Sequence, residues 1–121
     1  MRHRVVTKKL GRDTAHRKAL KKNLAVDLIK HGSIVTSVVK AKYVRPYVEN
    51  LVTKTNTKSD KLSLLGYLRS HLSDEEAIKI LMEDIAPRYK NRKGGYTRIV
   101  RVGNRLGDNS SMARISFLEE K

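Results

Sequence analysis

A net charge of +15 on 121 residues opposes any compact fold, because like charges repel one another unless a partner neutralises them. Nearly all of this excess lies in two segments. Residues 1–22 contain nine Lys or Arg against one acid, and residues 88–105 contain seven against none. Residues 23–87 are almost neutral, with nine basic residues against eight acids. This distribution is typical of a binding surface for a polyanion, and nucleic acid is the first candidate.

The neutral middle can supply one modest core, as expected for a single domain of this length. We find no internal repeat and no linker that would divide the chain. No apolar run approaches 18 residues and no signal pattern opens the sequence, so we expect no membrane partner and a soluble, cytoplasmic protein. The absence of cysteine excludes disulfides and thiolate sites, and fits a reducing compartment.

The first half of the chain is predicted to contain a tail, a helix, a strand and a second helix. Residues 1–12 are charged and lack an apolar period, so we expect a basic extended tail, followed by one domain over residues 13–121. Asp13 or Thr14 can cap a helix that ends near His31, where Gly32 suits a positive φ. The β-branched run 33–37 predicts a strand.

A second helix is expected to follow and to reach about Thr55, because apolar residues recur there at helical spacing. Pro46 conflicts with it and predicts a kink or a later helix start. A third helix, about 61–71, would place Leu62, Leu65 and Leu68 on one face.

The C-terminal half is predicted to add a fourth helix and two strands. Ser73 and Glu76 match a capping box, and the helix that they open should bury Ala77, Ile78, Leu81 and Ile85 until Pro87 ends it. Two strands follow from Tyr96, and Ala113, Ile115 and Phe117 share a face of the second. The order α-β-α-α-α-β-β predicts a two-layer α/β domain with a small mixed three-stranded sheet covered by helices.

Catalytic chemistry has little support in the sequence. The four histidines lack ligand-like spacing, and no P-loop, nucleophile-elbow or zinc-protease motif occurs. The neighbouring acids Glu75 with Glu76 and Glu83 with Asp84 diverge around predicted helices and are expected to be solvated. We therefore expect no enzyme, no metal, no cofactor and no small-molecule substrate.

The N-terminal basic segment is predicted to bind RNA phosphates. Its basic residues can release counterions from a nucleic-acid backbone, and the cations in the first half of the helix oppose the helix dipole, which favours an external anion. The predicted contacts are Arg2, His3, Arg4, Lys8, Lys9, Arg12, His16, Arg17, Lys21 and Lys22.

The second basic segment lies in a loop region over residues 86–110 and combines charge with glycine and an aromatic residue. Gly94 and Gly95 allow close approach of the backbone to a phosphate or a positive φ. Tyr96 either offers its ring to a base or packs on the core. The predicted contacts here are Arg88, Lys90, Arg92, Lys93, Gly94, Gly95, Tyr96, Arg98, Arg101 and Arg105.

Three blocks of residues resemble one known family. They are the opening MRHR with His16, Arg17, Asn23 and His31; Ile34, Thr36, Lys40, Ala41, Lys42, Glu49, Leu51, Val52 and Thr53; and Arg88, the run RKGGYTRI, Arg105, Gly107, Asp108, Asn109, Met112 and Ala113. Together they are similar to the bacterial large-subunit ribosomal protein L17 family. Ser37, Tyr43, Pro46 and Asn56 depart from its pattern.

The resemblance implies a structural component of the large ribosomal subunit without catalytic activity. Its implied partners are the large-subunit rRNA, which it would bind and stabilise through the basic arm and the glycine-rich loop, and neighbouring ribosomal proteins. Two other classes remain open from the residues alone. A DNA-architectural protein would usually carry an arm with an apolar tip, and the sequence shows no candidate for one. A small RNA-modifying enzyme or nuclease would need convergent catalytic groups, which are lacking.

Overall fold

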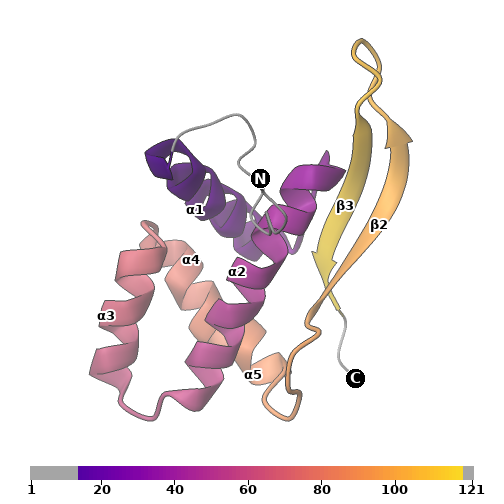
Figure 1. Ribbon diagram of the computed structural model, residues 1–121. Helices are drawn as coiled ribbons and strands as arrows, with labels where there is room; N and C mark the ends of the chain where they lie inside the picture. Colours follow the sequence, from indigo (N-terminus) through magenta and orange to yellow (C-terminus); the bar gives the residue numbers. More distant parts are fainter. Residues whose placement is uncertain (1–13, 119–121) are drawn as a thin grey trace, which may run out of the picture.

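The computed structural model describes residues 14–118, which form helices on one side of a small sheet (Figure 1). The predicted basic tail, residues 1–12, and the proposed cap Asp13 lie outside the described residues. The elements are α1 (Thr14–His31), β1 (Ser33–Ser37), α2 (Val38–Thr57), α3 (Lys61–His71), α4 (Glu75–Ile80), the π-helical turn η1 (Leu81–Ile85), α5 (Ala86–Arg88), β2 (Thr97–Asn104) and β3 (Ser111–Phe117). The predicted α/β class and element order are confirmed.

The sheet is antiparallel throughout, so the expected mixed sheet is wrong. Its strand order is β1-β3-β2, and both pairs run antiparallel. A turn joins β2 directly to β3, which makes these two strands a hairpin. After the helices, the chain returns so that β3, and not β2, pairs with β1, and Ile115 lies between Ile34 and Ile99.

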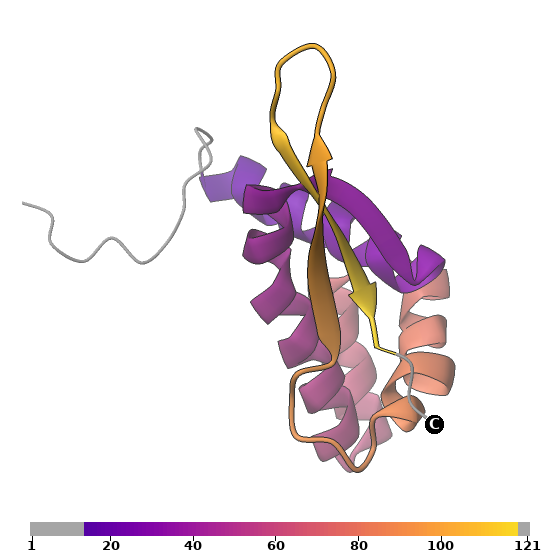
Figure 2. The same ribbon diagram turned by 90° about the vertical axis from the view of Figure 1, so that its right-hand side faces the viewer.

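Only one face of the sheet is covered. Ala113, Ile115 and Phe117 of β3 are buried on that face, as the alternation predicts, and they pack in one cluster with Val44 and Leu51 of α2. In the view turned by 90°, the hairpin lies in front of the helices and continues beyond them (Figure 2). A β-bulge between Arg101 and Gly103 interrupts the β2–β3 register at this point.

Helix α1 is described from Thr14 and ends at His31, as the sequence predicts, and its burial is uneven along its axis. Ala25, Leu28 and Ile29 in its second half are buried, whereas the basic first half is exposed or half-buried. Gly32 follows with φ +80°, a value that favours glycine, and its backbone N–H donates to the Leu28 carbonyl. One end of α1 therefore enters the core while the other faces solvent.

Helix α2 begins at Val38, eight residues before Pro46, so the alternative of a later start is wrong. The Ser37 hydroxyl caps it by accepting from the Lys40 backbone N–H at 3.3 Å. Val38, Ala41 and Val44 are buried. The cap and this burial stabilise the first turns, although Pro46 cannot donate a helical hydrogen bond.

Three further details of the helices differ from prediction. Leu62 is 80% exposed because it lies in the first turn of α3, which contacts the core through Leu64 and Leu68. The cap of α4 is Asp74, not Ser73: its carboxylate accepts from the Ala77 backbone N–H at 3.0 Å. The predicted inward residues Ala77, Ile78, Leu81 and Ile85 are all buried. Helical structure continues past Pro87, which occupies the first turn of α5, where a missing N–H is tolerated.

The cap of α4 is expected to make stability depend on acid pH. The Lys30 ammonium, 2.7 Å from the Asp74 carboxylate, and the Ala77 N–H hold the pKa of Asp74 below its usual value. A lowered carboxyl pKa stabilises the fold above the unfolded pKa, and this contribution is lost as the pH falls through the folded pKa. Asp74→Ala should therefore lower the melting temperature at pH 7, and the difference from wild type should shrink in acid. Ser73→Ala, measured in parallel by circular dichroism, should melt like wild type at both pH values.

Candidate nucleic-acid interface

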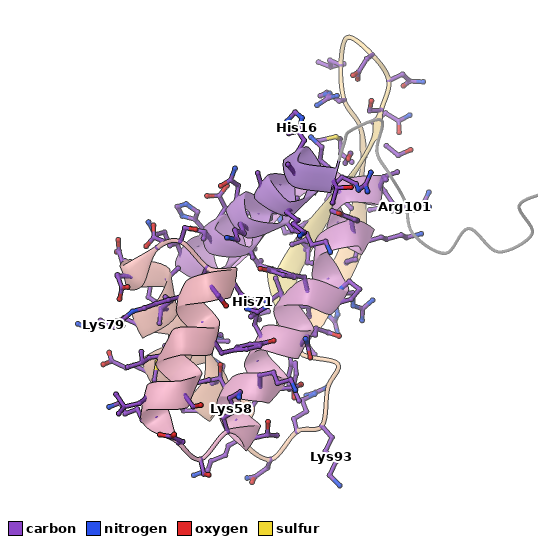
Figure 3. All side chains as sticks on the ribbon, turned by 60° about the vertical axis from the view of Figure 1, so that its left-hand side comes forward. His16, Lys58, His71, Lys79, Lys93 and Arg101 are labelled. Carbon is purple, nitrogen blue, oxygen red and sulfur yellow. The ribbon has the colours of Figure 1, made fainter. Side chains whose placement is uncertain are left out.

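Three lysines of α1 line a pocket where α1, α2 and α3 meet. The pocket has a volume of about 380 Å³ and is lined by Lys18, Lys21, Lys22, Tyr47, Ser70 and His71. No acid is among the described residues that line it. His71 lies at this junction and His16 marks the start of α1 above it (Figure 3). We call these three lysines and the pocket that they line the lysine pocket.

Aromatic side chains form one wall of the lysine pocket and hold Lys21 in place. The Lys21 ammonium lies 5.0 Å from the ring centroid of Tyr43 and 5.6 Å from that of Tyr47. The Tyr47 hydroxyl donates to the His71 carbonyl at 2.6 Å, and burial raises the pKa of Tyr47 to about 12, so that this hydroxyl stays protonated. The His71 ring stacks on Tyr67 at 4.2 Å. The wall is therefore fixed before any ligand arrives.

Sequence reasoning missed Lys18, Tyr43 and Tyr47 as members of this surface. Tyr43 and Tyr47 are separated by four residues and so share a helix face, a signal that was present in the sequence. Their relation to the α1 lysines depends on how α1 packs across α2, which no local pattern records. Among the predicted contacts, Arg2, His3, Arg4, Lys8, Lys9 and Arg12 lie outside the described residues.

The glycine-rich loop between α5 and β2 lies at the opposite end of the molecule from the start of α1. Figure 3 shows Lys93 pointing away from the body at that end, far from His16. Gly94 and Gly95 have φ values of +104° and +65°, as the sequence allowed, and a Cβ at either would meet no other atom within 4 Å. The glycine-rich loop and the basic start of α1 therefore do not form one continuous patch in residues 14–118.

Tyr96 packs inward, so the alternative in which its ring stacks on a base is wrong. Its ring is 1% exposed and lies 5.2 Å from the ring of Tyr89. Its hydroxyl donates to the Arg92 carbonyl at 3.1 Å and lies 3.0 Å from the Thr53 hydroxyl. Because the hydroxyl has partners inside the fold, burial of the ring leaves no polar group unsatisfied. Tyr96 anchors the loop to α2 and presents no surface to RNA.

Arg92 and Arg98 come together at the base of the uncovered sheet face. Both line a shallow depression of about 640 Å³ together with Ser33 and Ser116. Arg98 pairs with Ser116, which in turn pairs with Ser33, so these three side chains share a row across the sheet. The row combines guanidinium and hydroxyl groups, which suit a phosphate oxygen.

The remaining predicted contacts differ in how much charge they can offer. Arg88 forms an ion pair with Asp84 at 3.1 Å, and Arg105 forms a bidentate pair with Asp108. Lys90 and Arg101 are exposed. Figure 3 shows Arg101 on the hairpin, at the same end of the molecule as His16. Local ion pairs thus engage Arg88 and Arg105 before any RNA is bound.

Other kinds of site are not apparent in the described part of the chain. Over residues 14–118, no group of three or more His, Asp or Glu side chains is placed to hold a metal ion. None of the helices described has the length and apolar character needed to cross a membrane. Glu75 and Glu76 pair with different cations, Arg69 and Lys30, and do not converge on one point.

Comparison with known proteins assigns the chain to a family. The family model described as ribosomal protein L17 matches residues 20–118. The large ribosomal subunit protein bL17 of Helicobacter hepaticus is 48% identical over 118 residues, covering 98% of this chain and all of the relative. The bL17 proteins of Nautilia profundicola and Petrotoga mobilis are 47% and 42% identical, covering 99% and 100% of this chain and 100% and 99% of the relatives. The resemblance carried by the opening, central and RKGGYTRI blocks is therefore confirmed, and the chain belongs to the ribosomal protein L17 family.

Proposed function

We propose that this chain is a structural constituent of the large ribosomal subunit and that it binds and stabilises the folded large-subunit rRNA. Its relatives are large ribosomal subunit proteins over nearly their whole length. The observation that carries the RNA part of the proposal is the lysine pocket, where three cations face an aromatic wall and no acid is among the described residues that line it. Such a surface fits a phosphate group better than it fits another protein's cations or an apolar ligand.

The family is a structural, non-enzymatic component of the ribosome, which confirms the prediction that the chain is not an enzyme. Neighbouring ribosomal proteins are the remaining proposed partners, and the cytoplasm follows as the place where ribosomes work. The proposed domain division is a basic arm over residues 1–12 and an RNA-binding domain over residues 13–121. In this arrangement the arm and the lysine pocket contact one part of the rRNA, and the glycine-rich loop contacts another.

A projecting arm with an apolar tip, the usual feature of a DNA-architectural protein, is present in the structure. The sequence offered no arm with an apolar tip, but the β2–β3 hairpin is such an arm, with Leu106 97% exposed at its turn. Membership of the ribosomal protein L17 family, and not the lack of an arm, therefore favours the ribosomal function over a DNA-architectural one. Sucrose-gradient sedimentation of the tagged protein in high salt tests it directly. We expect comigration with the 50S particle, whereas migration with DNA would contradict the proposed function.

Two variants of the glycine-rich loop are expected to distinguish simple neutralisation of phosphate charge from a contact that depends on the shape of the loop. Lys93→Ala should weaken binding to large-subunit and small-subunit rRNA transcripts equally, and should reduce the slope of log affinity against log salt by about one unit. Gly95→Val places a β-branched residue at φ +65° and should reduce binding only to the large-subunit transcript, because the loop can no longer keep its shape. Filter binding across a salt series measures both effects.

The matched control for this loop is Lys90→Ala, which removes one exposed charge from the same segment without touching the glycines. Its effect should resemble that of Lys93→Ala. If Gly95→Val binds both transcripts as wild type does, the loop makes no fitted contact with RNA, and the proposed interface reduces to the arm and the lysine pocket.

A further inference from the structure

The β2–β3 hairpin presents a leucine to solvent at the point farthest from the core. Figures 1 and 2 show the hairpin extending beyond all helices, with its turn, residues 105–110, at the free end. Leu106 in this turn is 97% exposed. Val100 and Val102 of β2 are about half exposed, at 50% and 47%. These three side chains give the projecting arm apolar surface that the fold does not bury, so this surface is available to a partner.

The turn that carries Leu106 is rigid because its own polar groups cross-link it. The Arg105 guanidinium donates to both oxygens of the Asp108 carboxylate, at 3.1 and 2.6 Å. The same carboxylate accepts from the Ser110 N–H at 3.1 Å, and the Arg105 N–H donates to the Ser110 carbonyl at 2.8 Å. Gly107 takes φ +103°, which a side chain would disfavour. The backbone that carries Leu106 is therefore braced before binding, which reduces the entropy that the turn loses on contact.

The charge around the hairpin indicates the chemistry of the partner. Strands β2 and β3 contain Arg98, Arg101 and Arg114 and no acid. The turn contains one acid, Asp108, and Arg105 already neutralises it. A protein partner would need an acidic groove along both strands to match these arginines. An RNA partner carries the matching negative charge already, in the phosphates on either side of each base. The observations thus favour RNA over protein.

We propose that Leu106 is a wedge residue that packs against unstacked bases of the large-subunit rRNA while the arginines of the hairpin contact the flanking phosphates. The inference rests on the proposed function and adds a contact that basic residues cannot make. An apolar side chain gains free energy from a base face only where that face is exposed, in a loop, bulge or widened step. Leu106 therefore recognises irregular RNA and not regular duplex.

Affinity measurements test the wedge with a matched leucine as control. Leu106→Ala should weaken binding to a large-subunit rRNA transcript about tenfold, because alanine has much less apolar surface than leucine to bury against a base. The slope of log affinity against log salt should stay unchanged, because no charge is lost. Leu62→Ala removes the same side chain from α3, where Leu62 is 80% exposed, and should bind as wild type does. Equal affinity of wild type and Leu106→Ala for the transcript would overturn the proposal that Leu106 is a wedge residue.

A second variant, Asp108→Asn, should change the affinity for RNA in opposite directions depending on whether the hairpin binds by charge alone or through a positioned Leu106. Asp108→Asn removes a negative charge and releases Arg105, so purely electrostatic binding would strengthen. If the braced turn positions Leu106, the same change should instead weaken binding to the large-subunit transcript several-fold. Stronger binding of Asp108→Asn to this transcript would contradict the proposal.

Crosslinking within the assembled particle identifies the partner. The photoreactive residue p-benzoylphenylalanine, introduced at position 106 of the full chain, should crosslink to rRNA in purified large subunits. Crosslinks to a ribosomal protein alone, or none at all, would overturn the wedge. Failure of wild-type protein to bind the transcript would instead reject the proposed function, so the two failures are distinguishable.

Discussion

Replacing Lys18, Lys21 and Lys22 together by alanine is expected to lower the affinity for large-subunit rRNA roughly a hundredfold at about 0.1 M salt, if each lysine contributes about 1 kcal/mol through a phosphate contact. The lysine pocket supplies the reason, since its three cations face the same space and none of the described residues that line this space is an acid. The slope of log affinity against log salt should fall by about two to three units, because about three fewer counterions are displaced. Filter binding from low to high salt measures both quantities.

The control for this triple variant is a second loss of three charges on surfaces that do not line the pocket. Lys54, Lys61 and Lys79 come from α2, α3 and α4, and Figure 3 shows Lys79 pointing away from His71. Their joint replacement by alanine lowers the net charge equally but should reduce affinity much less. Equal losses in the two triple variants would mean that net charge alone governs binding, and the lysine pocket would not be a site.

Replacing Tyr96 by alanine is expected to destabilise the fold by about 3 to 5 kcal/mol, the usual cost of removing a large aromatic side chain from a core. The ring contacts Tyr89, and the hydroxyl joins Thr53 to the Arg92 carbonyl, so that packing and hydrogen bonds are lost together. Tyr96→Phe keeps the ring and should cost roughly 1 kcal/mol. Urea denaturation followed by circular dichroism measures the free energy of unfolding of each variant.

RNA binding of the Tyr96 variants distinguishes the inward ring from a stacked one. Under conditions where Tyr96→Phe and Tyr96→Ala are folded, both should bind rRNA nearly as wild type does, because the ring does not reach the surface. An unchanged unfolding free energy for Tyr96→Ala, together with a loss of affinity of about 1 to 3 kcal/mol, would be the signature of base stacking and would contradict the structure.

The elements of this fold were predictable because each leaves a local signal. Gly32 after α1 and the alternation of Ala113, Ile115 and Phe117 in β3 depend on neighbouring residues alone, and both predictions are confirmed. The direction of strand pairing was not predictable, because it depends on the path of the chain after four intervening helices. The prediction of Ser73 as the cap of α4 is wrong for a similar reason: Lys30, distant in sequence, contacts Asp74.

The candidate site was predictable in composition but not in arrangement. Charge counts identify the basic segments, yet the chain places His16 and Lys93 at opposite ends of the molecule. Charge counts also cannot reveal that Asp108 forms an ion pair with Arg105 or that the rings of Tyr43 and Tyr47 contact the Lys21 ammonium. These relations arise from packing between elements, and the fate of Tyr96 shows that an aromatic residue within a basic run can serve the core instead of the surface.

The position of β3 in the sheet has a consequence for how the protein is made. Of the three strands described, β3 is the last to leave the translating ribosome, and it is the central strand that joins β1 to β2. Until residues 111–117 emerge, β1 has no neighbour, and Ile115 and Phe117 are missing from the core that they complete. The helices can collapse during synthesis, but the sheet can close only after residues 111–117 have been made, since its pairing joins residues 33–37 to residues 111–117. A nascent chain stalled before residue 111 should therefore remain sensitive to protease.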